Sequence, residues 1–480
     1  MIWRKKEIQE LYDILDSNKS ELVAVYGRRR VGKTFLINEV YKNEIVFRHT
    51  GLPSFIENDD KSNNKLKRQL EAFVNSLFEY KIIDRKIKVR SWLEAFDLLR
   101  AGIDNKYNDQ RIVLFIDEMP WMETPKSYFL EAFTNFWNNY CSHKNNIVLV
   151  VCGSASSWIL NNVIHGKGGL YGRITHQIQL LPFDLKECEE FLISNGINYS
   201  HYEIAEAYMT LGGIPYYLGY LNKRLSLAQN LDMLFFNKNA ILSNEFYELF
   251  SSQFTTPDKY RRIVELLGEK NIGYTSKEII EKSNFTSNGS LFDALKALEK
   301  SAFIISYIPF GGKVSDKRYK LIDPFSLFYL KQVKNNIGND NYWQSNLENQ
   351  KIVTWRGYAF ENLCFNHIFN IKKQLGISGI ISNDSMWYLN NEDIKNTTQI
   401  DLILNRKDNV VNLCEIKFYN NSFNINKDMH LNLMNKMESL KILINKRTSI
   451  QNVLITTFGL KSGQYSSDFS NIITLDDLFE

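Results

Sequence analysis

Short uninterrupted runs of apolar residues alternate with helix-like stretches over the first 180 residues of the chain. The runs at 22–26, 112–116 and 147–152 carry no polar alternation, which is typical of parallel strands covered by helices on both faces. Aromatic residues recur at helical spacing over 128–140, and we interpret them as core packing. From residue 183 to about 250 helical periodicity replaces the strand signal. The pattern predicts a parallel α/β core followed by helices.

A different pattern begins near residue 256. Three amphipathic stretches, at 258–268, 276–282 and 287–300, predict short helices. Apolar runs on either side of the Gly311–Gly312 turn then predict a β-hairpin. Three helices followed by a hairpin have the outline of a winged helix-turn-helix. Residues 255–330 hold twelve Lys or Arg and nine Asp or Glu, a surplus of +3 that suits either DNA or a protein partner.

The polar, asparagine-rich stretch 331–350 is interpreted as a linker or mobile connector. Beyond it, the periodicity predicts elements in the order α-β-β-β-α-β. These are a helix at 356–370, strands near 385–389, 399–404 and 411–418, a helix at 428–443 and a strand at 451–457.

Composition narrows the class of protein. The 480 residues are 44% hydrophobic and 23% charged, as in globular proteins, and the net charge is only +4. Any nucleic-acid contact must therefore come from a local patch. The five cysteines are scattered without a CxxC pair, which argues against a disulfide framework or a zinc site. The N-terminus is charged, and no apolar run approaches the ~20 residues of a membrane span, so we expect a soluble, cytoplasmic protein.

Residues 27–34 read GRRRVGKT and match the pattern GxxxxGK[ST] between an apolar strand and a helix. Gly27 and Gly32 let the backbone wrap around phosphate oxygens, and amides at the start of the helix point at the anion. In this pattern Lys33 neutralises the β- and γ-phosphates, and Thr34 ligates Mg²⁺. The segment predicts an ATP site that uses Mg²⁺.

A phosphate loop requires a carboxylate at the end of a neighbouring parallel strand. Asp117 and Glu118 follow the run 112–116, so we expect Asp117 to hold Mg²⁺ through water and Glu118 to polarise the attacking water. Ser154 ends a further strand, where it either senses the γ-phosphate or caps a helix.

Phosphoryl transfer also uses a guanidinium group on the transition-state charge. Arg173, in a glycine-rich segment, is our candidate, and a solvated loop arginine is an equal alternative. Arg28, Arg29 and Arg30 in the loop receive no catalytic role.

Several ordered motifs over about residues 1–250 resemble the archaeal-type ATPase family of AAA+/STAND-like P-loop ATPases. They are WRKKEIQEL (3–11), GRRRVGKT (27–34), FIDEMPWM (115–122), VCGSASSW (151–158), LYGRITHQIQLLPF (170–183) and GGIPYYL (212–218). The resemblance implies a parallel five-stranded core with a helical lid, and it places Pro215 in the lid near the nucleotide. No arginine stands beside GGIPYY, which departs from a lid that contacts the γ-phosphate through arginine.

The C-terminal segment carries a second group of charged residues on apolar strands. Glu415 and Lys417 are two residues apart and share one strand face, and Asp401 lies opposite the apolar face of its own strand. Carboxylates from two neighbouring strands suit Mg²⁺, and an adjacent lysine can orient or deprotonate water. Glu361, on the preceding helix, could complete the ligands.

This spacing, over about residues 350–480, resembles the PD-(D/E)xK restriction-endonuclease-like superfamily and a domain of unknown function that often follows such ATPases. Gln399 replaces an acidic residue that is common in that superfamily. Two alternatives stay open: a surface ion pair on an edge strand, and a retained fold that has lost catalysis.

Together these features predict an α/β multidomain protein: an ATPase coupled through a winged helix to a Mg²⁺-dependent nuclease-like domain that acts on nucleic acid, DNA rather than RNA. The alternative is a nucleotide-switched regulator that binds DNA or protein, with a non-catalytic C-terminal platform. A homo-oligomer is compatible with both. The predicted segments are a P-loop ATPase core at 1–182, a helical lid at 183–254, a winged helix-turn-helix at 255–330, a linker at 331–350 and a nuclease-like domain at 351–480.

Overall fold

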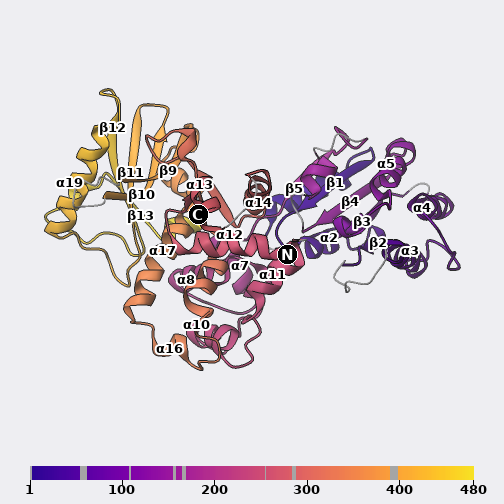
Figure 1. Cartoon of the computed structure of the whole chain (residues 1–480), viewed down its shortest axis with the longest axis horizontal. Helices are drawn as coiled ribbons and strands as arrows, with labels where there is room; N and C mark the ends of the chain where they lie inside the picture. The colour runs from indigo at the N-terminus through magenta and orange to yellow at the C-terminus, as the bar shows by residue number, and fades with distance from the viewer. Residues whose placement is uncertain are drawn as a thin grey trace. The chain divides into compact units, whose positions relative to one another are not determined.

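The computed structural model describes residues 3–53, 62–107, 110–154, 158–164, 169–254, 256–283, 288–389 and 398–480. The chain forms two compact units, Met1–Leu181 and Pro182–Glu480, which are described separately below. Figure 1 shows the first unit from indigo to magenta and the second from magenta to yellow. Over the described ranges, every helix is too short or too polar to span a bilayer.

A five-stranded parallel sheet forms the centre of the first unit, as the sequence predicts. The predicted runs become β1 (Glu21–Tyr26), β3 (Ile112–Asp117) and β4 (Ile147–Gly153), which are buried along their whole length. β2 (Ile45–Thr50) and β5 (His176–Gln179) complete the order β2-β3-β4-β1-β5. All neighbouring strands are parallel, so their carboxyl ends meet at one edge.

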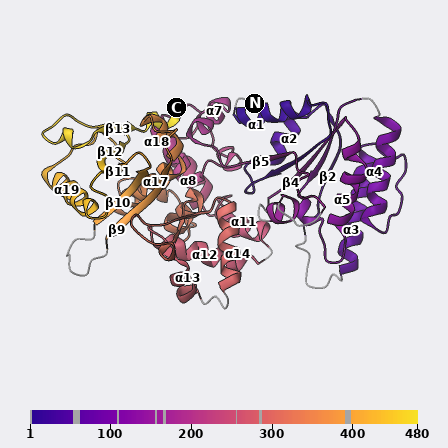
Figure 2. The ribbon, with the colours of Figure 1, turned by 90° about the horizontal axis from the view of Figure 1, so that it is seen from above.

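Helices cover both faces of this sheet. Figure 2 shows α3, α4 and α5 on one face and α1 and α2 on the other. The predicted aromatic stripe is on α5, where Phe129, Phe133 and Phe136 are buried, and Phe136 stacks on Phe96 with ring centroids 5.0 Å apart. The bounds are α1 Lys5–Leu15, α2 Lys33–Val40, α3 Ser62–Glu79, α4 Trp92–Lys106 and α5 Phe129–Asn139.

The second unit begins with short helices, as predicted from the periodicity. Three of them start at capping boxes, on Asp184, Ser200 and Ser226. Pro215 is the first residue of α9, and Tyr217 of the same helix is buried and donates a 2.6 Å hydrogen bond to Glu245. These helices are α7 Leu185–Ser194, α8 His201–Leu211, α9 Pro215–Leu218, α10 Leu227–Leu231 and α11 Glu245–Gln253.

Three helices and a small antiparallel sheet follow, close to the predicted positions. The hairpin strands β7 and β8 are joined by a third, two-residue strand, β6, in the order β6-β8-β7. The bounds are α12 Pro257–Glu269, β6 Tyr274–Thr275, α13 Ser276–Ser283, α14 Asn288–Lys300, β7 Ile304–Tyr307 and β8 Arg318–Leu321.

The segment 331–350 differs from the predicted linker. It continues the helical turn η6 (Tyr329–Val333) and holds α16 (Tyr342–Ser345), whose Trp343 is fully buried. The Trp343 ring lies 5.5 Å from that of Trp355, and its backbone amide donates a 2.7 Å hydrogen bond to Asp232. This segment is therefore packed into the second unit rather than acting as a mobile connector, because one tryptophan anchors an otherwise polar stretch.

A second five-stranded sheet closes the chain, in the order β13-β12-β11-β10-β9 (Figure 1). β9, β10 and β11 are antiparallel, whereas β11, β12 and β13 are parallel. The predicted order is present, with α18 and β13 in addition. The bounds are α17 Gln350–Asn366, α18 Ile368–Gln374, β9 Ser382–Leu389, β10 Thr398–Arg406, β11 Val410–Lys417, α19 Lys427–Lys441, β12 Ser449–Thr456 and β13 Asn471–Thr474.

Candidate functional site

The predicted phosphate loop follows the carboxyl end of β1 and leads directly into α2. A Cβ atom on Gly27 would lie 2.1 Å from the backbone oxygen of Leu180, so only glycine fits there. Gly32 has φ +94°, a left-handed conformation that glycine adopts without strain, and it caps the start of α2. The backbone geometry therefore explains both glycines of the motif.

Lys33 lies folded against the loop itself. Its ammonium group is buried and donates hydrogen bonds to the carbonyl oxygens of Gly27, at 3.0 Å, and Arg28, at 2.9 Å. A cation held inside a backbone loop at the start of a helix is the arrangement that binds phosphate groups. The Arg28 side chain is buried, and Arg29 and Arg30 are half-buried.

The loop and the predicted carboxylate meet at the edge of the sheet. The Thr34 hydroxyl donates a 2.8 Å hydrogen bond to Asp117 Oδ2, and Arg48 Nη2 lies 3.4 Å from the same oxygen. A hydroxyl and a carboxylate in contact supply hard oxygen ligands of the kind Mg²⁺ prefers, so these residues fit a Mg²⁺-bound triphosphate.

The expected strand adjacency is wrong. β4 lies between β1 and β3, so the loop strand and the acidic strand are not neighbours. The two elements still converge because all three strands end at the same edge, and the first turn of α2 brings Thr34 across to Asp117.

Glu118 and Ser154 form a second contact at this edge. Glu118 has φ +47°, and its Oε2 accepts hydrogen bonds from the Ser154 hydroxyl, at 2.9 Å, and the Ser154 amide, at 3.2 Å. Ser154 is fully buried, so this contact fixes the glutamate side chain. The helix that Ser154 was alternatively expected to cap would begin in residues 155–157, which lie outside the described residues.

Arg173 does not join this group. It is exposed and precedes β5, and the nearby Thr175 amide donates to the Leu22 carbonyl near the start of β1. That is the opposite edge of the sheet from Gly27, about 16 Å away at the rise of an extended strand. The Arg173 side chain cannot span this distance, so a catalytic role for it could be realised only on a second copy of the chain.

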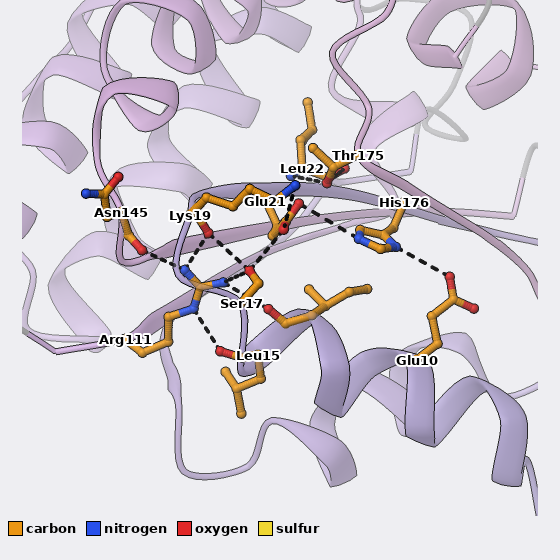
Figure 3. Close-up of polar contacts among 11 residues, drawn as sticks. Glu10, Leu15, Ser17, Lys19, Glu21, Leu22, Arg111, Asn145, Thr175 and His176 are labelled. Carbon is orange, nitrogen blue, oxygen red and sulfur yellow. Dashed lines mark hydrogen bonds and ion pairs between the residues drawn. The ribbon is translucent and has the colours of Figure 1, made fainter.

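At the edge of the parallel sheet where the strands begin, near Arg173, the polar contacts hold the structure together. Figure 3 shows the Arg111 guanidinium reaching the backbone oxygens of Leu15, Lys19 and Asn145, at 3.0, 2.6 and 2.8 Å. These bonds tie the end of α1 to the start of β1 and satisfy carbonyls left over by the helix. The buried Glu21 lies in the same group, beside His176 (Figure 3).

In the second unit, the predicted residues of β10 and β11 do come together. Lys417 Nζ donates hydrogen bonds to Asp401 Oδ2, at 3.4 Å, and to Glu415 Oε2, at 3.2 Å. Asp401 Oδ2 also accepts from the Ile416 amide at 3.1 Å. Asp401 and Glu415 are both buried, which excludes a surface ion pair.

A lysine that the sequence reasoning did not identify completes the partners of Glu415. Lys436, on α19, donates a short hydrogen bond to Glu415 Oε1, and its side chain is buried. Each oxygen of this carboxylate is therefore paired with an ammonium group. Pairing of this kind offsets the cost of burying the charge.

Glu361 is capped by residues from the small antiparallel sheet and its surroundings. Asn271 Nδ2 donates to Glu361 Oε2 at 2.6 Å, and the buried Lys320 Nζ donates to Asn271 Oδ1 at 2.7 Å. Burial, reinforced by the Asp401 charge, raises the pKa of Glu361 to about 7. Burial lowers the pKa of Lys320 to about 8, against the attraction of Glu361 and Asp401.

The expected three-carboxylate metal site is not formed. Within the described parts of the chain, no three His, Cys, Asp or Glu side chains are arranged to hold a metal ion. Glu361, Asp401 and Glu415 are instead bound by lysine ammonium groups and by amides. These residues do not fit a metal in the arrangement that the structure gives them.

Comparisons with known proteins agree with the geometry of the first unit. Residues 2–221 match the model of a family described as an ATPase domain predominantly from Archaea. This segment is similar to a P-loop ATPase. The match ends at residue 221, so it does not extend to the C-terminal sheet.

Relatives and one solved structure extend the comparison. An uncharacterized protein of Methanocaldococcus jannaschii is 26% identical over 420 residues, covering 86% of this chain and 87% of that protein. An uncharacterized ATP-binding protein of Pyrococcus abyssi is 27% identical over 300 residues, covering 58% and 87%. A Walker-type ATPase structure from Pyrococcus abyssi aligns with TM-score 0.48 at 17% identity, covering 69% of this chain and 96% of that one.

Proposed function

We propose that the first unit binds and hydrolyses ATP with Mg²⁺, and that the second unit responds to it. The observation that carries this proposal is the 2.8 Å contact between Thr34 and Asp117, because it joins the phosphate loop to the acidic strand. The match of residues 2–221 to an ATPase family supports it.

Each residue has a distinct part in this reaction. The loop amides and Lys33 hold the β- and γ-phosphates, and Thr34 and Asp117 supply oxygens to Mg²⁺, which neutralises phosphate charge. Glu118 polarises the attacking water, and Ser154 orients the Glu118 carboxylate through the 2.9 Å hydrogen bond. Arg173 lies outside this group, whereas the Arg48 guanidinium lies 3.4 Å from Asp117 Oδ2 within it.

The test is release of phosphate from ATP by the full-length protein, with Mg²⁺ and with excess EDTA. We expect Mg²⁺-dependent hydrolysis that falls to background in Lys33→Ala. Lys42→Ala is the matched control, because Lys42 is exposed just beyond α2. A Lys33→Ala protein that hydrolyses ATP at the wild-type rate would contradict the proposal.

For the second unit, we propose a nucleic-acid-binding platform that does not cut its ligand. The +3 surplus of residues 255–330, with their three helices and small sheet, supports a winged helix-turn-helix. The lysine pairing of Asp401 and Glu415 favours a platform over a Mg²⁺-dependent nuclease, because ammonium groups occupy the carboxylate oxygens that a metal ion would need as ligands.

Binding and cleavage are both measured with labelled DNA and RNA, single- and double-stranded, in Mg²⁺ or Mn²⁺. We expect binding that weakens as salt rises, with the strands left intact. Cleavage that is lost in Asp401→Ala and Lys417→Ala would establish a nuclease instead. Salt-insensitive or undetectable binding would contradict the nucleic-acid platform and favour a protein partner.

A further inference from the structure

A cavity of about 650 Å³ lies within the second unit. It opens where the end of α12 meets η6 and one face of α17, and its apolar floor includes Leu267, Leu321 and Leu327. Its volume falls in the range of 300–1,000 Å³ that is typical of small-ligand sites. Neither the ATP site nor the lysine-paired carboxylates Asp401 and Glu415 belong to its lining.

One wall of the cavity is a single face of α17. Lys351, Thr354, Trp355 and Tyr358 are spaced three and four residues apart, so they lie side by side along the helix. Trp355 is buried against Trp343, whereas Tyr358 is 45% exposed. The wall therefore gives a ligand an accessible aromatic ring on a rigid support.

The charged residues of the lining are mostly basic. Lys270, Lys331 and Lys351 line the cavity, and Glu269 is the single acidic residue beside them. Lys270 is 4.0 Å from a carboxylate, that of Glu278. For Lys331 and Lys351, the described part of the chain contains no carboxylate within ion-pair distance, so their charges are available to an anion.

Side-chain amides complete the lining. Gln332, Gln350 and Gln399 each offer a donor and an acceptor. Gln399 stands two residues before Asp401 on β10, and Asn271, which also lines the cavity, donates to Glu361. Two lining residues are therefore neighbours of the carboxylates, which themselves lie outside the lining.

We infer that this cavity binds a nucleoside phosphate, with the base against Tyr358 and the glutamines and the phosphate among the three lysines. An acyl chain with an acidic head would also suit the floor and the lysines. It would, however, make no use of the side-chain amides of Gln350 and Gln399 or of the Thr354 hydroxyl. A base satisfies them, because its edge carries donors and acceptors and its face stacks on an aromatic ring.

Two kinds of ligand contain a nucleoside phosphate: a free nucleotide, and an unpaired nucleotide within a nucleic-acid strand. The second source deepens the proposal of a nucleic-acid platform and depends on it, whereas the first does not. The position of the cavity beside Asn271 and Glu361 is compatible with either.

The experiment measures two kinds of probe on the full-length protein. Labelled single-stranded DNA and RNA hexanucleotides are titrated by fluorescence anisotropy, and radiolabelled AMP and a dinucleotide by equilibrium dialysis. No other nucleotide is present, and a Lys33→Ala sample is measured beside each protein to account for any probe that binds the loop at 27–34.

Two variants alter the cavity in different ways. Lys331→Glu/Lys351→Glu reverses the charge, and Thr354→Trp fills the space from an exposed helix position. Lys446→Glu is the matched control, because Lys446 is exposed and outside the lining. We expect at least one probe to bind about tenfold or more weakly to both cavity variants and within about twofold of wild type to the control.

The outcomes separate the two proposals. Binding of every probe that is unchanged in both cavity variants overturns the cavity proposal, and hexanucleotide binding among these leaves the platform standing. Nucleotide binding that is lost in the variants, with no hexanucleotide binding, supports the cavity and contradicts the platform. Binding of neither probe, or displacement of both by laurate, overturns the assignment of a nucleoside phosphate.

Discussion

Each unit brings carboxylates to the end of its sheet, but their partners differ. In the first unit, Asp117 and Glu118 accept hydrogen bonds from the hydroxyls of Thr34 and Ser154, with Arg48 at 3.4 Å from Asp117. In the second unit, Asp401 and Glu415 share Lys417, and Lys436 pairs with Glu415 as well.

This difference separates a carboxylate held by neutral donors from one held by two cations. Glu118 accepts hydrogen bonds from a hydroxyl and an amide, whereas both oxygens of Glu415 are paired with ammonium groups. Asp117 and Asp401 each have a cation at 3.4 Å, Arg48 and Lys417. A metal at Glu415 must displace an ammonium group and leave that lysine without its partner, which is costly.

The comparison predicts that the largest effect on stability is in the second unit. Lys436→Met should destabilise it by about 3 kcal/mol, because Glu415 loses an ammonium partner while it stays buried. Lys441→Met on the same helix is the control, since its pairing with Glu438 is exposed, and it should cost less than about 0.5 kcal/mol. Urea unfolding measures both, and equal costs would refute the distinction.

In the first unit, the larger effect should be on chemistry. Glu118→Gln keeps the shape of the side chain but removes its charge, so kcat for ATP hydrolysis should fall by about 100-fold or more. The affinity for ATP should stay within a few-fold of wild type. Stopped-flow binding and phosphate release separate the two quantities, and a kcat near that of wild type would remove Glu118 from the mechanism.

The raised pKa of Glu361 makes the second unit sensitive to pH. Between the ordinary value of 4.5 and about 7, the unfolded carboxyl ionises while the folded one stays protonated. Stability contributed by this group is complete below pH 4.5 and is lost as pH rises through 7. From pH 5 to pH 7.5, wild type should lose about 2 kcal/mol more than Glu361→Gln. The free energies of unfolding are measured with urea. An equal change for the two proteins between pH 5 and pH 7.5 would contradict this.

The smallest effect concerns the orientation of Glu118. Ser154→Ala removes the 2.9 Å hydroxyl contact but leaves the backbone amide bond to the same oxygen. We expect kcat to fall by about tenfold, the worth of one hydrogen bond to a charged group. Ser154→Thr keeps the hydroxyl and should recover most of the rate. An equal loss in both variants would indicate disturbed packing rather than lost orientation.

Much of the fold could be predicted, because the hydropathy pattern of a short segment indicates whether it forms a strand or a helix. The runs that become β1, β3 and β4 are unmistakable in hydropathy, and so is the alternation of β10 and β11. The strand order could not be read this way, since hydropathy does not say that β4 separates β1 from β3. The burial of Trp343 could not be predicted for a related reason, because one buried residue in a polar stretch gives no periodic pattern.

The residues of the candidate sites also divide into those that a local sequence pattern predicts and those that it does not. The members of the phosphate loop follow from a contiguous motif, and Asp117 and Glu118 follow from their place after a strand. Lys320 and Lys436 were missed, because each lies far along the chain from the carboxylates it influences. The signal available for Lys320 was a charged side chain within the short buried strand RYKL.

The close approach of Gly27 to Leu180 has a mechanical consequence. The loop that would receive the triphosphate rests on the backbone of a residue only two positions before Pro182, where the second unit begins. The Arg4 guanidinium donates a hydrogen bond to the carbonyl oxygen of Leu181, which lies between Leu180 and Pro182. The chain therefore leaves the parallel sheet at a point that is fixed against the phosphate loop by this close approach and by the Arg4 hydrogen bond.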